Sequence, residues 1–240
     1  MSIFSVITIR EGSEGLRNKC LRKIGAKAVF EYTIEYSIAL ACKIEEEVFT
    51  VVSSDSEVVS KYCSESNINF LKRTTELASN LARIEDVIYD TYREVGRDFD
   101  YISLMYGNIP VRYPDEFVKA YSFLQKNKDY DAVLSMQKVE KFNPAWMYEL
   151  NKNVLPAKKS EGFRRQDLTQ LMIHDGHTVL FRAKHFLKFM ENNPVHTIMY
   201  QAFGKKIKPM LNDRLIIDVD TEKDLKLAEA VLVRKSKIDR

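Results

Sequence analysis

Residues 3–19 read IFSVITIREGSEGLRNK, an apolar, β-branched run followed at once by a loop that contains two glycines. Near-continuous apolar runs are typical of strands covered on both faces, as in parallel sheets. The run 3–9 therefore predicts a buried first strand. The loop 10–19 follows its carboxyl end, where open α/β sheets bind their ligands.

Apolar runs and helical patterns alternate along the rest of the chain. Strands are expected at 48–53, 68–71, 101–105, 132–136, 177–182 and 215–219, and helices at 30–41, 56–64, 84–95, 114–125, 183–191 and 222–233. This order predicts an α/β fold, with a doubly wound, mostly parallel sheet and helices on both faces. Asp55 is expected to cap the helix 56–64. The pattern loosens over 137–173, which predicts an inserted arm within a single domain 1–240.

Composition narrows the class of protein. The chain has 240 residues, 45% of them hydrophobic, which argues against disorder. A net charge of +3 argues against a nucleic-acid partner bound by bulk charge. No run approaches the ~20 apolar residues of a membrane helix, so no membrane partner is expected. Three cysteines without a CxxC pair support neither a disulfide framework nor a zinc ribbon, and we expect a cytoplasmic location.

The loop 10–19 is the first candidate site. Arg10, Arg17 and Lys19 place three cations within ten residues. Gly12 and Gly15 allow close backbone approach to a ligand. Cations and backbone N–H groups together could neutralise a triphosphate. The loop has neither the Gly-Lys-Ser/Thr of a Walker A motif nor GxGxxG. The alternative is a solvated turn without a ligand.

The doublet Asp218-Val-Asp220 is the second candidate. Alternate residues of an extended segment point to the same face, so the two carboxylates could hold one Mg²⁺. Alternatively, Asp220 or Thr221 caps the following helix, with Asp224 at capping-box spacing. That alternative leaves Asp218 unexplained, because an acidic group after an apolar run needs a partner.

Two further features carry side chains suited to recognition. Adjacent Arg164 and Arg165 suit bidentate binding of a carboxylate or phosphate, although such pairs are often solvated. His174 and His177 flank Asp175-Gly176, which predicts a hairpin-like turn. The four histidines show no zinc-site register, and a structural role is expected for them.

Four motifs, in order and at matching spacing, carry a resemblance to a known family. They are residues 10–19, VSSDSE at 52–57, RRQDL at 164–168 and IDVDT at 217–221. With them, the chain resembles the CMP-acylneuraminate synthetase family over about residues 3–232. The resemblance implies a GT-A-like nucleotidyltransferase fold that binds CTP and Mg²⁺. In such enzymes the anomeric hydroxyl of a sialic-acid-like (nonulosonic) sugar acid attacks the α-phosphate of CTP, and pyrophosphate leaves.

The resemblance also implies roles for particular residues. It assigns catalysis to Arg10, Lys19, Asp218 and Asp220; nucleotide or cofactor binding to Arg10, Gly12, Ser13, Lys19 and Asn108; Mg²⁺ to Asp218 and Asp220; and the sugar side to Tyr106, Arg164, Arg165 and Gln166. The segment 137–173 would be a dimerisation arm, so a homodimer or a dimer of dimers is expected.

Four residues depart from the family pattern. Glu14 stands where the family usually has Lys, Cys20 where it has Asn, and Tyr106 where it has Gln. Asn108 stands where the related enzymes for 3-deoxy-octulosonic acid carry an acidic metal ligand. Two alternatives therefore stay open: a nucleotidyltransferase for a different sugar or nucleotide, and a catalytically silent nucleotide-binding protein.

Overall fold

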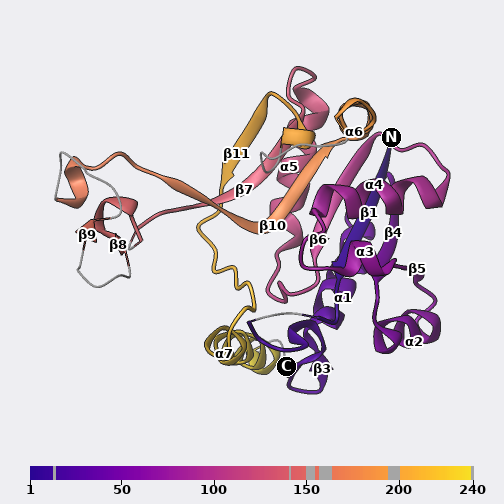
Figure 1. Cartoon of the computed structure of the whole chain (residues 1–240), viewed down its shortest axis with the longest axis horizontal. Helices are drawn as coiled ribbons and strands as arrows, with labels where there is room; N and C mark the ends of the chain where they lie inside the picture. The colour runs from indigo at the N-terminus through magenta and orange to yellow at the C-terminus, as the bar shows by residue number, and fades with distance from the viewer. Residues whose placement is uncertain (13–14, 141, 150–154, 157–163, 194–200, 239–240) are drawn as a thin grey trace.

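A seven-stranded sheet forms the centre of the molecule, in the order β11-β7-β10-β6-β1-β4-β5 (Figure 1). The computed structural model describes residues 1–12, 15–140, 142–149, 155–156, 164–193 and 201–238. The sheet strands are β1 (Ser2–Ile9), β4 (Glu47–Ser54), β5 (Asn69–Lys72), β6 (Tyr101–Tyr106), β7 (Ala132–Lys138), β10 (Met172–Arg182) and β11 (Ile207–Leu211). β1 is buried along nearly its whole length, as its apolar run predicts.

Strand direction confirms the mostly parallel sheet. β1 pairs in parallel with β4 and β6, β4 with β5, and β7 with β11. Only β10 among these strands runs antiparallel to both of its neighbours, β6 and β7. The carboxyl ends of β1, β4, β5 and β6 therefore lie along one edge of the sheet, where the predicted loops follow them.

Helices cover both faces of the sheet, so the expected α/β class is confirmed. The helices are α1 (Val29–Ala41), α2 (Glu57–Glu65), α3 (Thr75–Ala78), α4 (Ile84–Val95), α5 (Pro114–Lys126), α6 (Ala183–Asn192) and α7 (Glu222–Ile238). α1, α2 and α5 bury side chains such as Phe30 and Phe117 in one core cluster. α4 and α6 bury Ile88 and Phe186 in a second cluster on the opposite face.

A third, smaller core lies at the carboxyl edge of the sheet. Leu16 of the first loop packs there with Ile217, Val219 and Ala228 of the last segment and α7. The short hairpin of β2 (Lys23–Ile24) and β3 (Lys27–Ala28) contributes to the same cluster. Apolar packing thus brings the two ends of the chain together beside the cleft described below.

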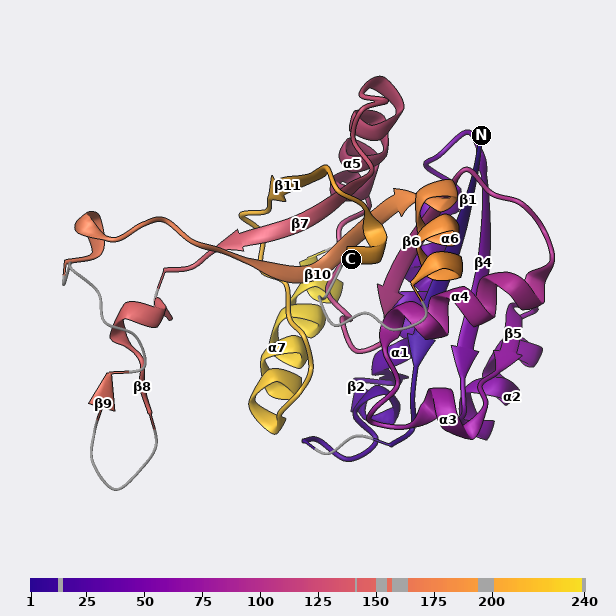
Figure 2. The same cartoon turned by 45° about the horizontal axis from the view of Figure 1, so that its top comes forward.

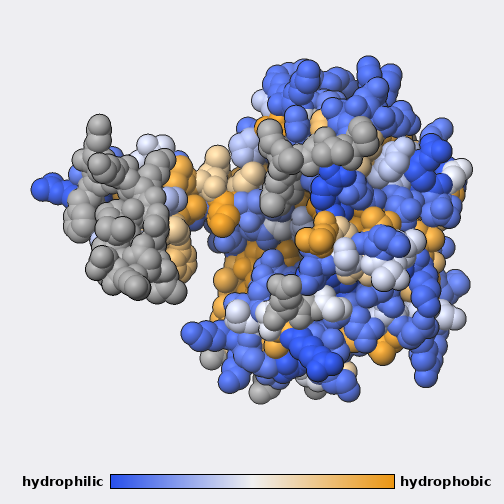
Figure 3. Space-filling view, viewed as in Figure 1, coloured by the Kyte–Doolittle hydropathy of each residue, from blue (hydrophilic) through white to orange (hydrophobic). Residues whose placement is uncertain are grey.

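An arm projects from the body of the molecule, away from the helices that cover the sheet (Figure 2). β7 and β10 extend into it, and it carries the strands β8 (Tyr148–Glu149) and β9 (Leu155–Pro156). Exposed apolar side chains gather on the arm and its neck: Phe142, Met147, Tyr148, Met172 and Ile173. Figure 3 shows apolar surface along the neck that joins the arm to the body. The expected insertion at 137–173 matches this arm.

Three local expectations are wrong. Residues 215–219 form no strand, and the Val219 N–H donates to the Asn108 carbonyl at 2.9 Å. The sheet instead ends with β11, which the sequence analysis missed. Asp55 caps no helix, because α2 begins after Ser56 and Asp55 accepts from the Glu11 N–H at 2.9 Å.

Among the described residues, no helix is both long and apolar enough to cross a membrane.

Candidate functional site

A cleft of about 800 Å³ opens at the carboxyl edge of the sheet. This volume falls within the range of small-molecule sites. Its described lining includes three cations, Arg10, Lys19 and Arg73, which follow β1 or β5. The lining from β7 and β10 includes Gln137, His174 and Asp175 instead. The order of the strands therefore separates a cationic half from a half without described lysines or arginines.

The first loop and the acidic doublet meet in this cleft. Lys19 donates to the Asp220 carboxylate and forms an ion pair with it. The backbones of the loop and the acidic segment also lie close together, because a Cβ added to Gly15 would lie 3.0 Å from the Asp220 carbonyl oxygen. A second ion pair, Arg22 with Glu222 at 2.6 Å, joins the end of the same loop to the start of α7. Cations and carboxylates from opposite ends of the chain thus share one wall.

Asp218 is held in place by Asn108, which follows β6. The Asn108 side-chain amide donates to its carboxylate, and the neighbouring Val219 N–H bonds the Asn108 backbone. The residue as a whole is exposed, yet desolvation of its carboxyl group raises the pKa of Asp218 to about 6. The nearby negative charge of Asp220 is the next largest cause. The charge of Asp220 therefore disfavours ionisation of Asp218.

The donor chemistry fits a hard divalent cation. Asp218 and Asp220 offer carboxylate oxygens, which Mg²⁺ prefers. Where the chain is described, no group of three or more potential metal-binding side chains occurs. Mg²⁺ commonly takes one or two carboxylates and completes its shell with water and substrate phosphates. The capping-box alternative is also realised, since Asp224 accepts from the Thr221 N–H at 2.8 Å, and this cap does not use the side chain of Asp218 or Asp220.

The amino-terminal side of the first loop is tied to the strands beside it. Arg10 donates to the side chain of Asn80, and both residues line the cleft. The Glu11 N–H donates to Asp55 at the end of β4. These bonds fix the start of the loop beside the carboxyl edge of the sheet, and two of its cations, Arg10 and Lys19, line the cleft.

Arg73 is a site residue that the sequence analysis missed. It is 7% exposed, and its Nη2 and Nε donate to the Ser53 carbonyl at 2.8 Å and the Ser53 hydroxyl at 3.3 Å. Burial lowers the pKa of Arg73 to about 10, so it stays charged at neutral pH. The available signal was its position directly after the short strand β5, at the same sheet edge as the other loops.

Buried polar groups fix the opposite wall of the cleft. Arg112 donates to the backbone carbonyls of Tyr106 at 3.0 Å and Ile109 at 3.1 Å, and to the carbonyl of His177. The ring Nε2 of His177 accepts from the Tyr113 N–H at 2.8 Å. Burial lowers the pKa of His177 to about 3, so the ring is neutral. A structural role for this histidine agrees with the geometry.

The expected hairpin turn at Asp175-Gly176 is wrong. Both residues lie inside the continuous strand β10, at a bulge between His174 and Val179. The Asp175 carboxylate accepts from the His177 N–H at 2.9 Å and the Asn212 amide at 3.2 Å. The bulge turns Asp175 toward the cleft that it lines.

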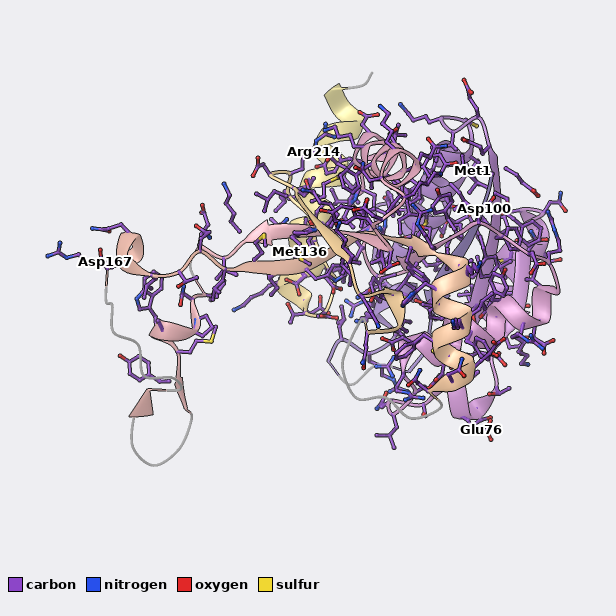
Figure 4. All side chains as sticks on the ribbon, turned by 90° about the horizontal axis from the view of Figure 1, so that it is seen from above. Met1, Glu76, Asp100, Met136, Asp167 and Arg214 are labelled. Carbon is purple, nitrogen blue, oxygen red and sulfur yellow. The ribbon has the colours of Figure 1, made fainter. Side chains whose placement is uncertain are left out.

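The structure places the predicted site residues in three groups. Arg10, Lys19, Tyr106, Asn108, Asp218 and Asp220 line the cleft together. Gly12 is not part of the lining, and Ser13 lies outside the described residues. Arg164, Arg165 and Gln166 lie at the far end of the arm, next to Asp167, away from the cleft of their own chain (Figure 4). Their role toward a sugar stays a prediction.

The open α/β sheet, with a cationic loop after its first strand and a pair of carboxylates facing that loop, is the architecture of a class of proteins suited to phosphate-bearing ligands. The family comparison makes the class specific. The cytidylyltransferase family model matches residues 5–238, and the chain belongs to this family of nucleotidyltransferases.

Sequence relatives agree with this family. The chain is 25% identical over 227 residues to N-acylneuraminate cytidylyltransferase of Streptococcus agalactiae serotype V, covering 93% of this chain and 52% of that protein. The chain thus spans about half the length of its streptococcal relatives. It is 26% identical over 242 residues to post-translational flagellin modification protein B of Campylobacter coli, covering 98% of this chain and 96% of that protein.

Solved structures share the fold. A CMP:2-keto-3-deoxy-manno-octonic acid synthetase complexed with CTP superposes with a TM-score of 0.74 at 14% identity, covering 98% of this chain and 100% of that one. The 4-diphosphocytidyl-2C-methyl-D-erythritol synthase of Anaerococcus prevotii gives a TM-score of 0.66 at 15% identity, with 96% and 95% covered. At these identities the likeness confirms the nucleotidyltransferase fold alone.

Proposed function

We propose that the chain transfers CMP from CTP to the anomeric hydroxyl of a nonulosonic, sialic-acid-like sugar acid. The hydroxyl oxygen forms a bond to the α-phosphorus, the bond to the β-phosphate bridging oxygen breaks, and pyrophosphate leaves. The hydroxyl proton passes to solvent. The observation that carries the proposal is the meeting of Lys19, Asp218 and Asp220 in one cleft of a cytidylyltransferase.

The cationic half of the cleft suits the triphosphate. Arg10, Lys19 and Arg73 approach it from two strand ends. Charge neutralisation and positioning are what this kind of transfer asks of a protein. Lys19 and Arg10 would hold the phosphates, and Lys19 would stabilise the negative charge on the departing pyrophosphate.

Asp218 and Asp220 would hold Mg²⁺. When bound there, Mg²⁺ would neutralise negative charge on the phosphates and act as a Lewis acid. Asn108 orients Asp218 through its amide, and its backbone carbonyl fixes the same segment through Val219. Among the described lining residues, Asp175 and His174 are held within the β10 bulge, and neither is required as a general base in this scheme.

The arm supports a homodimer or a dimer of dimers. Its exposed apolar side chains, including Phe142, Met147 and Tyr148, suit a covered surface. Arg164 and Gln166 lie at its tip, where they could reach a cleft only in another copy of the chain. A guanidinium delivered there would pair with the sugar's carboxylate, for which the β7 and β10 half of the cleft offers no described cation.

The test is pyrophosphate release with CTP, Mg²⁺ and a panel of acceptors that includes N-acetylneuraminic acid, its nonulosonic relatives and 3-deoxy-octulosonic acid. The proposal predicts release with at least one nonulosonic acid and none without an acceptor. Folded protein that releases pyrophosphate with no member of the panel would contradict it.

A second candidate keeps nucleotidyl transfer but changes the nucleotide or the sugar. Cys20 and Tyr106, two departures from the family pattern, both line the cleft. Burial raises the pKa of Cys20 to about 12, so it presents a neutral thiol there. Thermal shifts with the four nucleoside triphosphates decide: a larger shift with ATP or GTP than with CTP would favour this candidate.

A further inference from the structure

The ion pair of Lys19 with Asp220 lies where the proposed metal ligand should be free. The Lys19 side chain is 20% exposed and that of Asp220 59%, so the pair lies at the cleft surface and not in the core. An ammonium group and a divalent cation seek the same carboxylate oxygens. Lys19 therefore competes directly with any cation for Asp220.

The two carboxylates differ in this respect. Asp218 accepts from the neutral amide of Asn108. An amide can rotate and offer its oxygen, whereas an ammonium group carries donors only. Among the described contacts of the two proposed metal-binding carboxylates, a cationic side chain therefore occupies only Asp220.

A triphosphate would remove the block. It carries more negative charge than one carboxylate and would bind beside Lys19 in the same cleft. Arg22, which does not line the cleft, would meanwhile keep the loop attached to α7 through Glu222. Lys19 can therefore change partners without the loop leaving its place.

On the basis of the proposed function, we infer that Lys19 masks Asp220 in the nucleotide-free chain. The free enzyme then binds a divalent cation weakly, and the cation enters together with the nucleotide whose phosphates take Lys19. The site would in this way avoid holding a cation in a position that blocks an incoming Mg²⁺-bound nucleotide.

A double-mutant cycle on nucleotide-free protein tests this inference, with Mn²⁺ as the probe and electron paramagnetic resonance as the readout of free ion. The four proteins are the wild type, Lys19→Gln, Asp220→Asn and the double variant. Lys19→Gln should bind Mn²⁺ about fivefold more tightly than the wild type, the order that an exposed ion pair contributes. The same substitution should tighten binding clearly less in the Asp220→Asn background, where only the weaker influence of the Lys19 charge on Asp218 remains.

Arg22→Gln is the matched control, because it removes a cation three residues after Lys19 and leaves the Lys19 pair intact. It should alter Mn²⁺ affinity less than twofold. Two results would overturn the inference: no tightening in Lys19→Gln, or equal tightening with and without Asp220. Thermal melting of every variant confirms folding. None of these measurements needs turnover, so pyrophosphate release without tightening would reject the mask and keep the function.

Discussion

The side-chain amide of Asn108 donates to the carboxylate of Asp218, and the two residues are joined again through the Val219 N–H. The loop after β6 thus orients the acidic segment that precedes α7. A hydrogen bond of this kind, from a neighbouring side chain to a carboxylate, fixes the direction of the carboxylate oxygens.

Replacing Asn108 by Ala should weaken the response to Mg²⁺. Loss of a supporting partner typically costs ten- to a hundredfold in metal affinity. We expect the Mg²⁺ concentration for half-maximal pyrophosphate release to rise about tenfold, with little change at saturating Mg²⁺. Asn80→Ala, which loses the Arg10 bond instead, is the control. An unchanged Mg²⁺ response in Asn108→Ala would contradict the role of this amide.

Asp218→Asn should stabilise the metal-free protein above pH 6. The folded pKa of about 6 is raised above the ordinary value of 3.8, so ionisation of Asp218 costs folding free energy; this cost grows as pH rises above 3.8 and is complete above the folded pKa. Solvent screening reduces it to about 1 kcal/mol, or a Tm gain of about 2–4 °C at pH 7.5. Thermal melts with EDTA should show the gain at pH 7.5 and a much smaller one at pH 4. A gain that does not depend on pH would refute this origin.

Arg73→Lys should raise the KM for CTP about tenfold, because a lysine keeps the charge but loses the bidentate fork that Ser53 positions. The KM for the sugar should change much less, since Arg73 lies in the cationic half of the cleft. Lys72→Ala, at the exposed neighbour that pairs with Glu57, is the control. Equal effects on the two KM values would argue against a nucleotide contact.

Gly176→Ala should destabilise the fold by about 2–3 kcal/mol. Gly176 has a φ of +70°, and a Cβ there would lie 2.5 Å from Cδ1 of the buried Ile109. Gly25 has a φ of +60°, and a Cβ added there would have no other atom within 4 Å. Gly25→Ala should therefore cost only the strain of a left-handed backbone, about 1 kcal/mol. Urea unfolding measures both, and equal losses would show that the contact with Ile109 does not matter.

Much of the fold could be predicted because parallel strands buried on both faces must be apolar almost throughout. The run 3–9 and the helix 84–95 coincide closely with β1 and α4. β11 escaped because Pro209 interrupts its apolar pattern, which an edge strand tolerates. The run 215–219 was apolar for another reason: Ile217 and Val219 pack under α7 without joining the sheet.

The parts of the site that depend on contacts between residues far apart in the sequence could not be predicted. The spacing of Asp218 and Asp220 indicated a shared face, and the sheet rule indicated which loops should meet. No local pattern could show that Asn108 holds Asp218 or that Ser53 holds Arg73. The placement of Arg164 depended on the direction of an arm, which its sequence does not encode locally.

The central claim is that the first loop and the acidic doublet form one nucleotide site, and calorimetric titration of CTP in the presence of Mg²⁺ tests it most directly. Lys19→Gln and Asp218→Asn change opposite ends of the chain, and each should weaken CTP binding at least tenfold, while the remote exposed variant Lys184→Gln should match the wild type. Wild-type affinity in both folded cleft variants would contradict the account.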